Sequence, residues 1–251
     1  MFTLKLKEFN IDMYNWDSID RFVQEFDFTI SAHKQIISLG TKNLNELNKK
    51  LNDEVNEILN NLREQHPNDE EYTSQTAYNH GAYESNVILN YSEILWKSII
   101  VYQVNQIESH LKALSFKCSE FFQPDTDLPT LNQKIISTYH EYLIKTCGIE
   151  SSKLNRIGPK MIKYYKVRNC IVHDDSVPND EVKKIIMDYK NIGYKQRSIY
   201  KPLMNQLLNE TYCLVMLNDI ELYFKELYAC IDNIYEAIER GKREAGNQIS
   251  K

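Results

Sequence analysis

The chain has 251 residues, of which 30 are Lys or Arg and 35 are Asp or Glu, so its formal net charge is −5 at neutral pH. Glycine (7) and proline (6) together make up 13 residues, about 5% of the chain where average usage is roughly 12%. This shortage disfavours folds that need a turn every ten residues, such as β-sandwiches. The sequence also lacks the glycine-rich patterns of P-loop and dinucleotide-binding enzymes.

Nothing in the sequence predicts a membrane span, a secretory signal or a metal site. The N-terminus has no apolar signal segment, and no stretch approaches the roughly 18 continuous apolar residues of a membrane helix. The five cysteines contain no C-x-x-C pair, so neither a disulfide framework nor a thiolate zinc site is indicated. We therefore expect a cytoplasmic protein with no membrane contact, no metal and no cofactor.

The first predicted helix has a narrow apolar stripe whose members are three or four residues apart: Leu44, Leu47, Leu51, Val55, Ile58 and Leu62. This period is typical of a helix that packs against a core, and it also fits a coiled-coil or dimer contact. His66-Pro67-Asn68-Asp69 is expected to end the helix.

After a polar stretch from Thr73 to Gly81, a second long helix is expected over about 83–121. Its apolar seam comprises Ile100, Val104, Ile107, Leu111, Leu114 and Cys118. Further helices are predicted over about 130–146, from Pro159 to His173, from Asn179 onward, and over about 202–240. Gly241 is expected to end the last of them. The predicted architecture is an all-α bundle of five to seven helices, with 1–82 as an N-terminal helical extension and 83–251 as the main domain.

The segment most informative about chemistry ends the helix predicted before His173. Arg168 carries a permanent charge that can grip phosphate oxygens, and His173 can give or take a proton near neutral pH. Metal-free RNA cleavage needs these two kinds of group. Five residues apart on a continuous helix, they point about 140° apart. They converge only if the helix ends between them or if two copies meet. Asn169 shares a face with His173 and is expected to orient its imidazole.

The run Arg168-Asn169-Cys170-Ile171-Val172-His173 resembles the signature of the HEPN superfamily, which is Arg, four to six residues, then His, often with Asn after the Arg. The resemblance covers about 83–240 and implies a helical bundle that forms a homodimer with one composite active site. It further implies a metal-independent endoribonuclease that leaves 2′,3′-cyclic phosphate and 5′-hydroxyl ends. Many members are bacterial toxins or phage-defence effectors, some with an antitoxin partner. Glu108 resembles a polar residue often found on the preceding helix.

A basic run surrounds this motif. Residues 151–173 contain six bases and no acid, which favours contact with a polyanion such as RNA. Lys160, Lys163 and Lys166 are expected to bind phosphates, and Tyr164 to stack on bases. Asp174 and Asp175 directly follow His173, where acids are expected either to raise its pKa or to repel RNA.

Two other readings of the sequence stay open. The first is a non-catalytic HEPN-like module that binds RNA, a nucleotide or a protein. The second is a helical interaction protein that dimerises through the Leu44–Leu62 stripe, with the Arg and His incidental.

Overall fold

A computed structural model describes residues 17–122, 135–149, 151–173, 178–188 and 208–249. Within these ranges the chain forms six α-helices and one short π-helix and contains no strand. The predicted all-α bundle of five to seven helices is confirmed.

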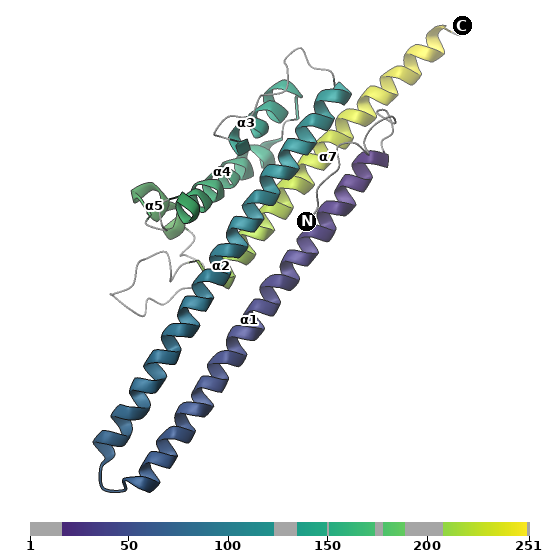
Figure 1. The fold of residues 1–251 in the computed structure, drawn as a ribbon. Coiled ribbons are helices and arrows are strands. Elements are labelled where there is room, and N and C mark those ends of the chain that lie inside the picture. The colour runs from purple at the N-terminus through teal and green to yellow at the C-terminus, as the bar shows by residue number, and fades with distance from the viewer. Residues whose placement is uncertain (1–16, 123–134, 150, 174–177, 189–207, 250–251) are drawn as a thin grey trace.

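The two longest helices form an antiparallel hairpin (Figure 1). They are α1 (Asp17–Gln65) and α2 (Glu70–Phe122). The predicted stop at His66-Pro67 is confirmed, and the Asp69 carboxylate caps α2 by accepting a hydrogen bond from the backbone N–H of Tyr72 (3.0 Å). The prediction that 73–81 is non-helical is wrong. Thr73 and Ala77 are buried, because small side chains let α1 pack closely against this end of α2.

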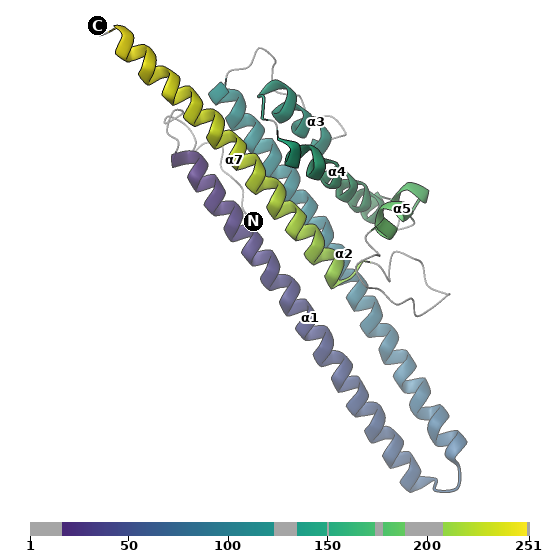
Figure 2. The same ribbon diagram turned by 180° about the vertical axis from the view of Figure 1, so that it is seen from behind.

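The remaining helices gather at the end of the hairpin away from its turn (Figures 1 and 2). The helix α7 (Glu210–Ile249) lies beside α1 and α2 and contacts both. The short α3 (Ile135–Glu141) continues into the π-helix η2 (Tyr142–Thr146). Then α4 (Ser152–His173) packs on α2 and α7, and α5 (Asp180–Asp188) packs on α4. We call this part of the molecule the body, and the projecting turn end of α1 and α2, about 42–95, the arm.

The core of the body is built from the periodic apolar positions. All six members of the predicted α2 seam are at most 1% exposed. They meet aromatic side chains from the other long helices: Phe22 and Phe26 of α1, and Phe224 and Tyr228 of α7. Burial of this apolar surface is the main stabilising contribution to the bundle.

Three predicted boundaries differ from the structure. Gly241 does not end the last helix, since α7 continues to Ile249. Pro159 lies inside α4, which begins seven residues earlier at Ser152. The division between 82 and 83 falls within α2, so one continuous helix belongs to both predicted parts, and α1 shares the core of the body. Of the helix expected over 130–146, residues 130–134 lie outside the described ranges.

Candidate functional site

The helix that carries the motif begins at a side-chain cap. The hydroxyl of Ser151 accepts a hydrogen bond from the backbone N–H of Leu154 (3.0 Å) and donates one to Glu226 of α7 (2.9 Å). Every third or fourth residue of α4 is then buried: Leu154, Ile157, Met161, Tyr164, Val167 and Cys170. This face fixes the rotation of α4 and thereby the directions of Arg168 and His173.

Gly158 permits a close contact in the middle of α4. A Cβ atom placed there would lie 2.5 Å from Cε1 of His140 on α3. The His140 ring is held by a hydrogen bond between its Nδ1 and the hydroxyl of the buried Tyr223 (2.8 Å), and burial lowers the pKa of His140. The packing of α3 and α7 on this part of α4 explains why the helix continues through Gly158 and Pro159. These contacts come from distant parts of the chain, so the local sequence does not predict them.

Arg168 is held between two helices. Its Nη1 donates to the side-chain oxygen of Asn169 (2.8 Å), and its Nη2 donates to that of Asn105 on α2 (2.9 Å). Its Nε is buried without a hydrogen-bond partner among the described residues. The guanidinium is thus oriented by neutral amides, which leave its positive charge available to an anion.

Glu108 lies one turn after Asn105 on α2, near this guanidinium. Burial raises the pKa of the Glu108 carboxyl, and the positive charge of Arg168 partly opposes that rise. The structure thus brings together three of the predicted site residues: Arg168, Asn169 and Glu108. Asn105 was missed in the sequence. Its position three residues before Glu108 could have indicated it, because this spacing puts both side chains on one face of the helix, beside the apolar seam.

His173 is the last residue of α4 and is exposed. Because α4 is continuous through both motif residues, Arg168 and His173 point about 140° apart. The helix does not end between them, so the remaining route to convergence is a second copy. The amide oxygen of Asn169 accepts a hydrogen bond from Arg168, and orientation of the His173 imidazole by Asn169 stays a prediction.

Three lysines of the basic run form ion pairs with acidic side chains of α5 and α7. Lys160 pairs with Asp219 (2.7 Å), Lys163 with Asp188 (3.7 Å) and Lys166 with Glu181. The side chains of these lysines are about 40% exposed. The acids paired with Lys163 and Lys166 are exposed too, so these two pairs are weak and a phosphate can replace the acid, whereas Asp219, the partner of Lys160, is largely buried. The basic character of this face is nevertheless smaller than the sequence count implies.

Tyr164 does not lie on that face. Its side chain is fully buried, and its hydroxyl donates to Asp219 (2.6 Å). The prediction that Tyr164 stacks on RNA bases is therefore wrong. The i, i+3 spacing of Tyr164 from Met161 and Val167 places it on the core face, and Asp219, which is 9% exposed, satisfies its hydroxyl.

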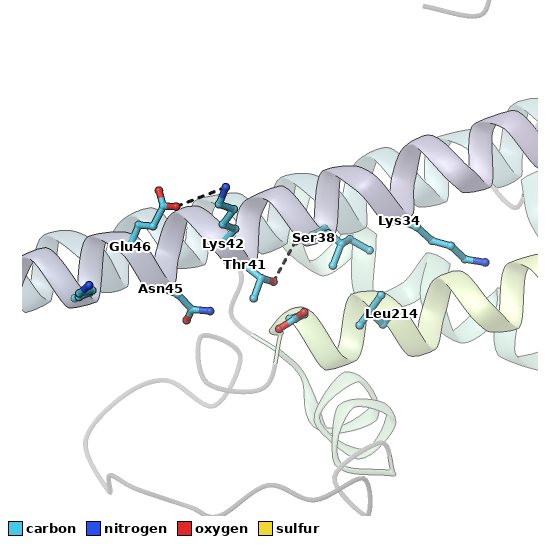
Figure 3. A pocket seen from close by; sticks show the side chains of 10 residues that line it. Lys34, Ser38, Thr41, Lys42, Asn45, Glu46 and Leu214 are labelled. Atoms are coloured by element: carbon cyan, nitrogen blue, oxygen red, sulfur yellow. Dashed lines mark hydrogen bonds and ion pairs between the residues drawn. The ribbon is translucent and has the colours of Figure 1, made fainter.

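A separate cavity of about 530 Å³ lies between α1 and the start of α7 (Figure 3). Two of its lysines are already paired: Lys34 with Glu221 (2.7 Å) and Lys42 with Glu46 (3.8 Å). Leu214 and Ile37 supply apolar walls, and Thr41 donates to the carbonyl of Ile37 (3.1 Å). Among the described residues that line this cavity, no nucleophile is paired with a base.

No family model, no curated protein and no solved structure matches this chain. Among the described residues no helix is long and apolar enough to span a membrane. The same ranges contain no cluster of His, Cys, Asp and Glu side chains that would hold a metal ion.

Proposed function

We propose that this protein is a metal-independent endoribonuclease of the HEPN type, with Arg168 and His173 catalytic and Asn169, Asn105 and Glu108 in support. The main support for the proposal is the environment of Arg168. Its guanidinium is oriented by the side-chain amides of Asn169 and Asn105, which are neutral. It lies on the same helix as His173, which is exposed at the helix end.

The chemistry follows from the groups present. The 2′-hydroxyl of a ribose attacks the adjacent phosphorus, the bond from phosphorus to the 5′-oxygen breaks, and a 2′,3′-cyclic phosphate and a 5′-hydroxyl result. One His173 accepts the proton of the 2′-hydroxyl, and the His173 of a second copy donates a proton to the leaving oxygen. Arg168 stabilises the negative charge that develops on the phosphate oxygens. The active unit is therefore a homodimer with a composite site.

The test is cleavage of a mixed RNA pool in the presence of EDTA by wild type, His173→Ala and Arg168→Ala. His66→Ala serves as the matched control, because His66 is exposed beyond the end of α1, far along the chain from the motif. We expect scission with cyclic-phosphate ends by wild type and His66→Ala, and a loss of at least roughly 100-fold in both motif variants. Equal scission by all four proteins would mean that the site is elsewhere.

The second candidate is a non-catalytic module that binds RNA or a nucleotide. The directions of the two motif side chains favour it, because Arg168 and His173 of one copy point about 140° apart on α4, so one copy offers a guanidinium to a phosphate but no complete catalytic pair. Retention of RNA by wild type without scission under any of these conditions would support this function. A role as a bacterial toxin or defence effector, with an antitoxin or other defence partner, rests on the family resemblance alone.

A further inference from the structure

The short helix α5 lies against α4 (Figures 1 and 2) and is held there by apolar side chains. Val182, Ile185 and Ile186 are at most 5% exposed. They belong to the same core cluster as Val167 and Cys170 of α4. Burial of these side chains fixes the position of α5, so its exposed acids are not needed for that.

Two exposed acids of α5 reach across to lysines of α4. Glu181 pairs with Lys166, and Asp188 pairs with Lys163 (3.7 Å). Glu181 and Asp188 are seven residues apart, so they lie within about 20° of each other on one edge of α5. A carboxylate carries a negative charge, as a phosphate group does. The helix α5 therefore places two anions where the lysines of α4 would otherwise meet RNA.

The lysine that Glu181 holds lies on the same face of α4 as His173. Lys166 and His173 are seven residues apart, which puts them within about 20° around the helix and about 10 Å apart along its axis. A stacked strand covers that length in roughly three nucleotides. An RNA strand that reaches His173 along this face therefore brings a phosphate near Lys166, and the acids of α5 compete with it.

The ion pair of Lys160, on the same helix, is of a different kind. Lys160 contacts both oxygens of Asp219 (2.7 and 3.0 Å), and the same carboxylate accepts a hydrogen bond from the buried Tyr164 (2.6 Å). The side chain of Asp219 is 12% exposed, against 61% for Glu181 and 54% for Asp188. Asp219 is thus part of the packing of α4 on α7, whereas the two acids of α5 can leave their lysines.

A lysine of α5 itself can take up the displaced acids. Lys184 is exposed and lies three residues after Glu181 and four residues before Asp188. These are the two spacings at which side chains of a helix meet. A phosphate that binds Lys166 or Lys163 therefore releases a carboxylate that has another cation within reach.

We propose that α5 is an autoinhibitory cover of the RNA-binding face: Glu181 and Asp188 occupy Lys166 and Lys163 until phosphates of an RNA strand replace them. The inference rests on the proposed function, which makes RNA the ligand of this face. It also defines the substrate class. A strand with several phosphates in a row displaces both acids, whereas a mononucleotide displaces one at most, so the cover favours RNA of several nucleotides.

The test is the affinity of the full chain for a labelled mixed-sequence 2′-O-methyl oligonucleotide, measured by fluorescence anisotropy. This probe lacks the attacking 2′-hydroxyl, so it is not cleaved during the measurement. The proteins are wild type, Glu181→Gln, Asp188→Asn and the matched control Asp180→Asn. Asp180 is an exposed acid of the same helix, but its ion pair is with Lys183 of α5 (3.1 Å). Thermal unfolding verifies that each variant is folded.

We expect Glu181→Gln to lower the dissociation constant of the oligonucleotide roughly 2- to 5-fold, the range set by an exposed ion pair. Asp188→Asn should have a smaller effect, because its pair with Lys163 is longer (3.7 Å). Asp180→Asn should leave the constant within about 1.5-fold, since salt screens an exposed charge that touches no RNA-binding lysine. In a Lys166→Gln background, Glu181→Gln should no longer tighten binding.

The inference is overturned by equal gains from Asp180→Asn and Glu181→Gln, by a gain from Glu181→Gln that persists without Lys166, or by no binding of the probe to any of these proteins. Cleavage of unmodified RNA separates it from the proposed function. Tighter binding by Glu181→Gln with no scission by any protein leaves the cover standing and removes the ribonuclease. Scission by wild type with no gain in affinity from Glu181→Gln removes the cover alone.

Discussion

The body and the arm are made from the same two helices, yet they differ in how completely their side chains are covered. In the body α2 has neighbours on several sides, α1, α4 and α7 among them, and Ile100, Val104 and Leu111 are fully buried. Among the described helices, only α1 packs on α2 in the arm, and Tyr83 and Ile94 stay largely exposed. Helical periodicity is similar in both regions. The difference shows that a two-helix hairpin buries one face of each helix, and that a complete core needs further layers.

The largest expected difference between the two regions is in the cost of removing an apolar side chain. Phe224→Ala empties a fully buried site in contact with the rings of Phe26 and Tyr228 and should lower the free energy of unfolding by about 3–5 kcal/mol. Leu62→Ala in the half-buried arm should cost about 1 kcal/mol or less. Urea denaturation measures both. Similar losses would mean that the arm is as well packed as the body.

Two buried histidines should make the body sensitive to acid. Burial lowers the pKa values of His33 and His110 from 6.5 to about 4, and His110 sits among the rings of Phe22, Phe26 and Phe224. As the pH falls, these two histidines therefore become protonated at a higher pH in the unfolded chain than in the folded protein. The stability associated with the neutral rings is complete above about pH 6.5 and is lost as the pH falls toward 4, by about 3 kcal/mol per histidine.

The check is the difference in unfolding free energy between pH 7 and pH 4.5 in wild type and in His33→Leu/His110→Phe. The variant should lose less stability over this range. Equal losses would show that other groups, and not these two rings, control the acid response.

The smallest expected difference in stability between body and arm is that between alanine substitutions at two helical glycines, Gly158 and Gly81. Alanine at either position gains about 1 kcal/mol in helix propensity. At Gly158 the new Cβ would meet the hydrogen-bonded His140 ring at 2.5 Å, and overpacking of about 1–3 kcal/mol should make the net change destabilising. At Gly81 in the arm the nearest atom is Cγ2 of Val55 at 3.1 Å, where a small shift of α1 suffices and the net change should be near zero. Thermal unfolding of Gly158→Ala and Gly81→Ala distinguishes the two, and a stabilised Gly158→Ala would contradict the close packing of α3 on α4.

The sequence predicted the features that depend on residues close together in the chain, and it failed where distant residues decide the structure. The seam of α2, the stop at His66-Pro67 and the helix start at Asn179 are confirmed. The Asn179 side chain caps α5 by accepting a hydrogen bond from the backbone N–H of Val182 (3.0 Å). Each follows from residues within a few turns of one another. The wrong predictions, at 73–81, Pro159 and Gly241, treated polar or helix-breaking residues as local stops where the surrounding helix continues.

The candidate site shows the same difference between local features, which the sequence predicted, and contacts between distant residues, which it did not. The sequence placed Arg168, Asn169 and His173 on one helix, because their spacing is a local property. It did not show that Asn105 of α2 holds Arg168, or that Asp219 binds Lys160 and Tyr164, because these contacts join residues 55 or more positions apart.

The sequence by itself determined that this protein is helical, that its core faces follow the apolar period, and that Arg168 and His173 lie on one helix. Only the tertiary structure decided which surfaces are covered. It joined α1, α2 and α7 into one core, turned Tyr164 inward, paired the basic run with acids of α5 and α7, and left Tyr83 and Ile94 of α2 exposed in the arm. The physical reason is that helix formation depends on neighbours along the chain, whereas burial and ion pairing depend on neighbours in space.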